Sequence, residues 1–272
     1  MKGAKGRRDP RPRTAIVCAF EPELPMLRAL LSRPRSQSIN GLDFTTGVVA
    51  GHPVVLHLCG MSMVNAAMSA QILIERFKVE RILVCGIAGG ADPALPVGTV
   101  AIPGRWAQYL EATFAREESH GYGPDILADS HGLSNFGMIF PHAVDLRSGG
   151  QGSRRKLWFE ADPALLALAR TLADQDPGLA VGGAGVSGPV FVDNAAFCAY
   201  LFETFAAQAV DMESAAITQV AYANDIPFIA IRGLTDRAGA EAGPNTALVH
   251  VDAVAAKSAA VVGALMAALP RD

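Results

Sequence analysis

The sequence has few aromatic residues and no excess of basic ones. Aromatic side chains make up 7% of its 272 residues, and 23 Lys and Arg against 26 Asp and Glu give a net charge of -3. Because this composition provides no basic surface for a phosphodiester backbone, we expect no nucleic-acid partner. Half of the residues are apolar, which is enough for one large domain with a buried core.

Cysteines and long apolar runs are also scarce. Cys18, Cys59, Cys85 and Cys198 are widely spaced and contain no CxxC pair that would indicate a zinc or redox site, so buried, reduced thiols are expected. No apolar run approaches the roughly 20 residues of a membrane span, and the N-terminus lacks the apolar core of a signal peptide. We therefore expect a cytoplasmic protein with no membrane partner.

Basic residues dominate the first 13 positions. Six Lys and Arg stand there among Gly and Pro, so this segment has too little apolar surface to become ordered. We expect residues 1–13 to be a disordered basic leader and residues 14–272 to form a single domain.

From Thr14 onward, apolar runs of strand type alternate with helical patterns. A β-hairpin is predicted around residues 42–60 and a helix capped by Ser62 directly after it. Further strands are expected at 14–20, 81–86, 97–103, 105–117, 179–188, 208–212 and 227–233, and further helices at 21–31, 162–175, 194–204, 214–225 and 246–269. This alternation predicts an α/β protein, a three-layer α/β/α domain with a central twisted, mixed and mostly parallel sheet.

The segment from about residue 117 to 156 interrupts the alternation. It loses periodicity and is rich in Gly, Ser, His and Pro. An irregular stretch of this length inside a compact domain is typical of a lid, a binding loop or an assembly surface.

Polar residues gather where the predicted strands end, and ligands of open α/β sheets bind at that edge. The candidate positions are Glu21 and Glu23, the turn 86–90, residues 191–194, Met212 with Glu213, and residues 232–236. Two structural alternatives stay open at this point. The acids, Asp211 among them, could only favour helix N-termini, and Arg232 could pair with Asp236 to close a loop.

Two other patterns do not indicate a cofactor or a metal. Gly183, Gly185 and Gly188 spell GxGxxG, but the Pro and β-branched residues that follow cannot open a helix to hold a pyrophosphate. His120, His131 and His142 lie in the irregular segment without the short spacing of paired ligands. We expect neither a cofactor nor a metal.

Five motifs together resemble the nucleoside phosphorylase and nucleosidase superfamily. They are "AFEPELPML", "CGIAGGADPALPVGTVAIP", "VSGPVFVDN", "VDMESAAI" and "IRGLTDRAG", in the order and at roughly the separations of that superfamily. The sequence is most similar to the branch of 5'-methylthioadenosine/S-adenosylhomocysteine nucleosidases and related plant storage proteins, over about residues 14–268 apart from the irregular insertion.

The resemblance implies specific roles for site residues. Asp236 matches the acid that protonates N7 of the leaving purine, and Thr235 matches the hydroxyl residue that orients this acid. Glu213 matches the carboxylate that holds the ribose hydroxyls, with Met212 packing on the sugar, and Glu23 matches the carboxylate that positions the attacking water. The other residues placed around the substrate are Phe20, Ile87, Ala88, Gly89, Phe191, Val192 and Arg232.

These roles agree with the chemistry of an N-glycosidic bond. Its cleavage builds positive charge on the ribose and negative charge on the base, so a proton donor is needed on one side and carboxylates on the other. The two acids must then differ in pKa, with Asp236 protonated and Glu213 ionised. The expected activity is hydrolysis of an adenine nucleoside.

Two departures from the family pattern bear on the choice between hydrolysis and phosphorolysis. Ile87 stands where many members have Ser or Thr, and Val84 and Cys85 stand where hexameric phosphorylases place a phosphate-binding arginine. A phosphate dianion would then be poorly compensated unless Arg232 or an arginine of the insertion served it. A phosphate-dependent phosphorylase and a non-catalytic nucleoside-binding or storage-like protein remain the alternatives. The resemblance also implies a homo-oligomer, with a homodimer expected.

Overall fold

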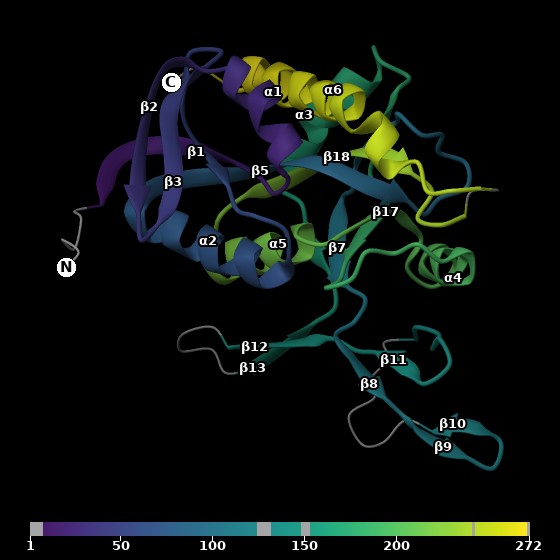
Figure 1. Ribbon diagram of the computed structural model, residues 1–272. Coiled ribbons are helices and arrows are strands. Elements are labelled where there is room, and N and C mark those ends of the chain that lie inside the picture. The colour runs from purple at the N-terminus through teal and green to yellow at the C-terminus, as the bar shows by residue number, and fades with distance from the viewer. Residues whose placement is uncertain (1–7, 124–131, 148–152, 241–242, 271–272) are drawn as a thin grey trace.

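The computed structural model describes residues 8–123, 132–147, 153–240 and 243–270 (Figure 1). Its strands are β1 (Asp9–Cys18), β2 (Ser32–Ile39), β3 (Leu42–Val49), β4 (His52–Leu58), β5 (Phe77–Gly90), β6 (Val100–Ile102), β7 (Arg105–Gln108), β8 (Ala112–Phe114), β9 (Arg116–Glu118), β10 (Gly121–Gly123), β11 (Ile139–Pro141), β12 (Val144–Arg147), β13 (Ser153–Lys156), β14 (Phe159–Glu160), β15 (Leu179–Val181), β16 (Ala184–Ser187), β17 (Ala207–Asp211) and β18 (Phe228–Asp236). Its helices are η1 (Glu21–Glu23), α1 (Leu24–Ala29), α2 (Met63–Arg76), α3 (Pro163–Ala173), α4 (Ala195–Phe205), α5 (Ser214–Ala223) and α6 (Ala247–Ala268).

One mixed, mostly parallel sheet forms the centre of the fold. Its main path runs β14-β7-β16-β17-β5-β1-β4-β3-β2, and β18, β6 and β15 extend it from β5. β1 is parallel to both β4 and β5, and β5 is parallel to β18. Helices α1, α3 and α6 cover one face, and α2 and α5 cover the other (Figure 1). The predicted three-layer α/β/α fold is therefore confirmed.

Side-chain caps explain where several helices begin. The Ser62 hydroxyl accepts from the Asn65 N–H at the start of α2, as the sequence predicted. Asp162 caps α3, which has proline in its first turn, and Asn194 caps α4. Each cap satisfies an N–H group that lacks a partner within its helix.

Helix α6 is long and apolar enough to cross a membrane by length and composition, although no apolar run of that length was expected from the sequence. Half of its most apolar stretch is buried inside the fold, where it packs on β18 and β5. We interpret α6 as a core helix of the domain.

The leader ends earlier than predicted, because β1 begins at Asp9. Its first residues pair with the start of β5, and the Arg13 guanidinium binds both the Asp9 carboxylate at 2.9 Å and the Val54 carbonyl oxygen at 3.2 Å. The basic residues thus join a strand through ion pairs and backbone contacts, which composition did not indicate. Residues 1–7 lie outside the described part of the chain.

Three other predictions need correction. The strand expected at 179–188 is two strands, β15 and β16, because Gly182 and Gly183 adopt positive φ between them. The insertion is not wholly irregular: its described residues include β10, β11, β12 and β13, of which β12 and β13 pair with each other and β11 pairs with β8, just before the insertion. These paired strands extend away from the domain (Figure 1). Strand β2 was missed because it is an exposed edge strand with no alternation of apolar and polar residues.

Candidate active site

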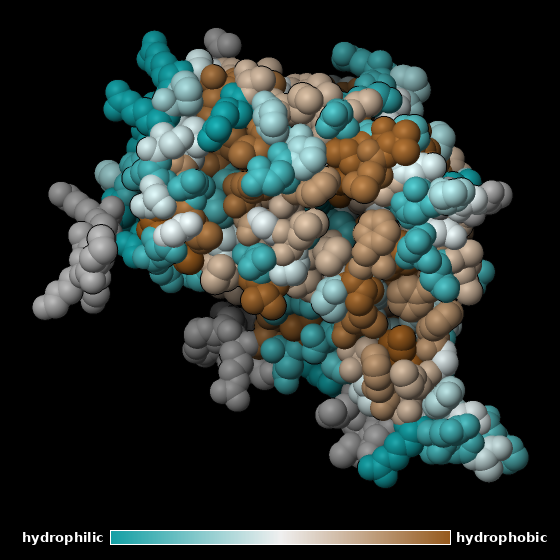
Figure 2. All heavy atoms as spheres, viewed as in Figure 1, coloured by the Kyte–Doolittle hydropathy of each residue, from teal (hydrophilic) through white to brown (hydrophobic). Residues whose placement is uncertain are grey.

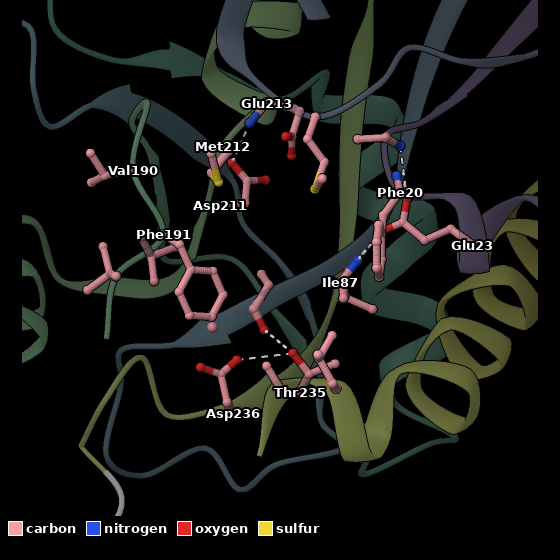
Figure 3. A pocket seen from close by; sticks show the side chains of 18 residues that line it. Phe20, Glu23, Ile87, Val190, Phe191, Asp211, Met212, Glu213, Thr235 and Asp236 are labelled. Atoms are coloured by element: carbon pink, nitrogen blue, oxygen red, sulfur yellow. Dashed lines mark hydrogen bonds between the residues drawn. The ribbon is translucent and has the colours of Figure 1, made fainter. Parts of the chain in front are cut away.

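A cavity of about 310 Å³ opens at the carboxyl ends of the central strands. Figure 2 shows apolar side chains gathered on the face where α6 begins, and Figure 3 looks into the cavity. The lining residues are Ala19, Phe20, Glu23, Met61, Ile87, Ala88, Gly89, Val190, Phe191, Val192, Val210, Asp211, Met212, Glu213, Thr235, Asp236, Ala247 and Leu248. The topology has therefore brought the ends of β1, β5, β16, β17 and β18 to one place.

Backbone N–H groups hold Glu23 in the cavity wall. Its Oε2 accepts from the N–H of Ala19 at 2.9 Å and of Phe20 at 3.0 Å, and its Oε1 accepts from the N–H of Ile87 at 2.9 Å. Glu23 is only 3% exposed because η1 turns it back under the end of β1. Three donors on one buried carboxylate fix its position on the side of β5.

Gly86 makes room for this carboxylate. A Cβ atom at this position would lie 2.4 Å from Glu23 Oε1 and 2.5 Å from Arg232 Nη1. Both distances are below van der Waals contact, so any larger residue would displace these groups. The glycine of the "CGIAGG" turn thus has a steric role beneath the cavity.

Arg232 lies behind the cavity and links its carboxylates. The side chain is 1% exposed, and its Nε is 2.7 Å from Asp211 Oδ2 and 3.0 Å from the Ser214 hydroxyl oxygen. Its Nη2 lies 3.6 Å from Glu213 Oε2. Arg232 pairs with these two acids in place of the loop-closing bridge to Asp236 considered above. Although it was expected among the substrate contacts, it is absent from the cavity lining.

Glu213 and Asp211, the acidic partners of this arginine, are each held by further hydrogen bonds. Glu213 Oε1 accepts from the backbone N–H of Ser62 at 3.0 Å. Asp211 Oδ1 accepts from the hydroxyl of Ser187 and from the backbone N–H groups of Glu213 at 3.2 Å and Ser214 at 3.1 Å. Asp211 therefore fixes both the arginine and the turn that carries Glu213.

Burial changes the proton affinity of this cluster. It raises the pKa of Glu213 to about 7, although Arg232 opposes the rise. Burial also raises the pKa of Glu23, against the effects of Arg232 and three backbone N–H groups. The pKa of Arg232 is raised, because Asp211, Glu213 and Glu23 outweigh the opposing effect of its burial. The arginine stays charged, while the carboxyl groups of Glu213 and Glu23 hold protons more tightly than in water. The expectation of an ionised Glu213 is therefore met only above about pH 7.

Asp236 enters the cavity from the end of β18, on the side of Phe191 (Figure 3). Its Oδ1 accepts from the Thr235 hydroxyl at 3.0 Å, and its Oδ2 accepts from the Ala238 N–H at 3.1 Å and the Asn245 side-chain amide at 3.2 Å. The side chain is 2% exposed. Asp236 thus faces the cavity in a buried and fixed orientation.

The remaining walls are mostly apolar. Phe20, Ile87, Met212 and Phe191 surround the space between the acids (Figure 3), and Phe191 is 62% exposed. Apart from Arg232, every residue placed around the substrate by the resemblance lines this cavity.

Seven lining residues were not predicted from the sequence: Ala19, Met61, Val190, Val210, Asp211, Ala247 and Leu248. Asp211 was considered only as a helix N-terminal acid. Leu248 lies in the first turn of α6 and Met61 lies just before α2, and no local sequence pattern distinguishes them from surface residues. Only the packing of α6 and of the segment before α2 brings them to the cavity.

No group of three or more His, Cys, Asp or Glu suited to a metal ion occurs among the described residues. His131 lies outside the described part of the chain. The four cysteines are buried and form no disulfide, and burial raises the pKa of Cys59 to about 12, which leaves this thiol unreactive at neutral pH.

The protein has a three-layer α/β/α fold, and four carboxylates line a cavity at the ends of its strands. Together these features are typical of an α/β enzyme that acts on a small molecule. The family model described as the phosphorylase superfamily matches residues 13–270. This chain belongs to the phosphorylase superfamily.

Individual relatives agree in sequence and in fold. The chain is 33% identical over 231 residues to a 5'-methylthioadenosine/S-adenosylhomocysteine nucleosidase of Bacillus cereus (strain B4264), covering 84% of this chain and 87% of that protein. The S. pneumoniae nucleosidase, solved with a transition-state inhibitor, matches with a TM-score of 0.76 and 27% identity over 95% of this chain and 100% of that one. The Streptococcus pyogenes S-adenosylhomocysteine nucleosidase, solved with 5-methylthiotubericidin, has a TM-score of 0.76 and 25% identity over 98% and 100% of the chains.

Proposed function

We propose that this protein hydrolyses the N-glycosidic bond of an adenine nucleoside of the 5'-methylthioadenosine or S-adenosylhomocysteine type. The observation that carries the proposal is the charge of the cavity. Among the described lining residues all four charged groups are carboxylates, and the nearby Arg232 is already paired with two of them. Such a cavity suits a neutral nucleoside whose sugar becomes cationic, and it disfavours a phosphate dianion.

The proposed reaction divides the work among three carboxyl groups. Glu23 takes a proton from the attacking water, whose oxygen bonds to C1' of the ribose. In its ionised form, Glu213 accepts hydrogen bonds from the ribose hydroxyls and stabilises the positive charge that develops on the sugar. Asp236 gives its proton to N7 of the purine as the C1'–N9 bond breaks, with Thr235 orienting it. The products are free adenine and the 5-substituted ribose.

The apolar walls support binding of the two neutral parts of the substrate. Phe191 offers an exposed ring face on which the purine stacks, with Val192 beside it providing backbone contacts to the purine. Met212 packs on the sugar. Met61 and Leu248 lie at the exposed rim of the cavity, where a thioether substituent finds apolar contacts.

Phosphate dependence tests the proposed hydrolysis against phosphorolysis. We expect adenine release from 5'-methylthioadenosine in phosphate-free buffer at a rate that added phosphate leaves unchanged, with free 5-methylthioribose as the second product. Product analysis by chromatography checks this. Release that requires phosphate and yields a sugar 1-phosphate would contradict the proposal, and tight adenine binding without cleavage would indicate a binding protein.

We also propose a homodimer in the cytoplasm that serves methionine salvage. Exposed apolar side chains around the cavity mouth support association of two copies. Buried thiols that form no disulfide are compatible with a reducing compartment.

A further inference from the structure

We infer that Asn245 is a positioning residue that ties Asp236 to the loop holding the purine. This inference rests on the proposed function, in which Asp236 is the proton donor. The Asn245 Nδ2 group donates to Asp236 Oδ2 at 3.2 Å and to Asp193 Oδ1 at 3.0 Å. Because an amide NH₂ carries two hydrogens, one group can serve both carboxylates.

Backbone contacts join the same two loops. The Asn194 N–H donates to the Ala238 carbonyl oxygen at 3.2 Å. Gly239 has φ +86°, and a Cβ atom there would lie 2.2 Å from the Asn194 nitrogen. Since Asp193 and Asn194 follow directly on the cavity residues 191–192, the acid and the purine wall form one unit, and Asn245 is a side-chain link between them.

The bridge also selects the oxygen of Asp236 that holds the proton. Oδ2 accepts from two N–H groups, those of Ala238 and Asn245, so a proton on this oxygen would compete with both donors. The proton is therefore held on Oδ1, beside the Thr235 hydroxyl. That hydroxyl then turns its hydrogen toward the Ala88 carbonyl oxygen, which lies 3.4 Å away. Loss of Asn245 would let the carboxyl group rotate and would slow proton transfer to the base.

Asn245 has a structural role that the experiment must separate from this one. Its Oδ1 accepts from the Ala247 N–H at 2.8 Å, near the start of α6. In Asn245→Ser the serine hydroxyl can still accept the hydrogen bond from the Ala247 N–H, but the serine side chain is too short to reach both carboxylates. Thr246→Ala is the matched control, because Thr246 makes no side-chain capping bond.

The test compares two leaving groups on the same sugar. Adenine needs a proton to leave, whereas 4-nitrophenolate leaves as a stable anion. With 5'-methylthioadenosine we expect Asn245→Ser to lower kcat by about 10- to 100-fold and to change KM by less than about threefold. With the 4-nitrophenyl glycoside of 5-methylthioribose, kcat should stay within about twofold of the parent protein. Thr246→Ala should match the parent protein on both substrates.

Several outcomes would overturn the inference: normal kcat of Asn245→Ser on the adenine nucleoside, a loss that falls on KM, or equal losses on both substrates. Asp236→Asn is assayed in parallel to test the proposed function itself. If Asp236→Asn selectively loses the adenine nucleoside and Asn245→Ser does not, only the role of Asn245 is wrong. If Asp236→Asn shows no such selectivity, the proposed proton donor is wrong.

Discussion

At the scale of single residues, Arg232 determines the charge of the site from outside the cavity. It is fully buried, lies 2.7 Å from Asp211 and 3.6 Å from Glu213, and lowers the proton affinity of Glu23. A buried guanidinium with such partners cannot leave them without a large desolvation cost. In the proposed reaction it holds the carboxylates that surround the sugar, and a phosphate ion would have to compete with two acids for it.

Replacing Asp236 by Asn tests the proton donor. The amide keeps the size of the side chain but has no acidic proton to give, so we expect turnover of 5'-methylthioadenosine to fall by about 10² to 10⁴. Circular dichroism and thermal melting should show that the fold persists. Near-normal turnover in this variant would remove Asp236 from its proposed role.

Glu213 should make the stability of the protein depend on pH. Its pKa rises from 4.5 to about 7 on folding, so between these values the folded state keeps a proton that the unfolded chain has lost. The free energy of unfolding should therefore decrease as pH rises from 4.5 to 7, by up to about 3 kcal/mol from this group. Urea titrations at several pH values, compared between the parent protein and Glu213→Gln, check this expectation.

The variant cannot titrate at position 213, so its unfolding free energy should fall less over the same pH range. Equal pH dependence in both proteins would show that burial does not shift this carboxyl group.

At the scale of secondary-structure elements, the site depends on close approach between η1, β5 and β18. β5 carries Gly86, whose missing side chain leaves space for both Glu23 and Arg232. The carboxylate comes from η1 and the guanidinium from β18, so one glycine decides whether the three elements can meet. A local pattern of glycines predicts a turn here, but not this packing role.

Gly86→Ala should therefore damage activity through geometry. The added methyl group must displace the Glu23 carboxylate, and we expect kcat to fall by at least about tenfold. Gly263→Ala in α6 is the matched control, because its Cβ would lie 3.5 Å from Leu30, an ordinary contact. The control should keep full activity and gain about 0.5–1 kcal/mol in unfolding free energy, as alanine favours helix. Full activity of Gly86→Ala would contradict the packing argument.

At the scale of the whole molecule, large apolar side chains are exposed around the mouth of the cavity. Met61, Val190, Phe191 and Leu248 line the cavity and are each at least 43% exposed. Val64 and Met68 on α2 and Val249 on α6 are also exposed. Exposed apolar side chains gathered around a cavity commonly mark an interaction site.

We expect a dimer in solution, measured by light scattering after size-exclusion chromatography. Val249→Asp places a charge on the exposed apolar surface next to the cavity and should shift the protein toward monomer, because an unpaired charge is costly to bury. Lys78→Asp is the charge-changing control, because Lys78 is an exposed residue at the end of β5 opposite the cavity. A monomeric parent protein, or a dimer that Val249→Asp leaves intact, would contradict this expectation.

Much of the fold followed from local patterns. Alternation of strand and helix signals predicted the α/β/α layers, and Ser62 predicted the start of α2. The polar edge strand β2, the break at Gly182 and the paired strands of the insertion were not predicted. Each of these features depends on which chain segments lie side by side. Backbone groups of adjacent segments can form strand hydrogen bonds even where the side chains show no strand pattern.

The sequence alone determined the class of fold and the strand ends at which acids stand, because periodicity and turn residues are local properties. Only the tertiary structure decided which acids share a buried arginine, why Glu213 holds its proton up to about pH 7, and that Asn245 reaches Asp236. Those features depend on distances and burial between segments far apart in the chain, and a linear pattern does not contain them.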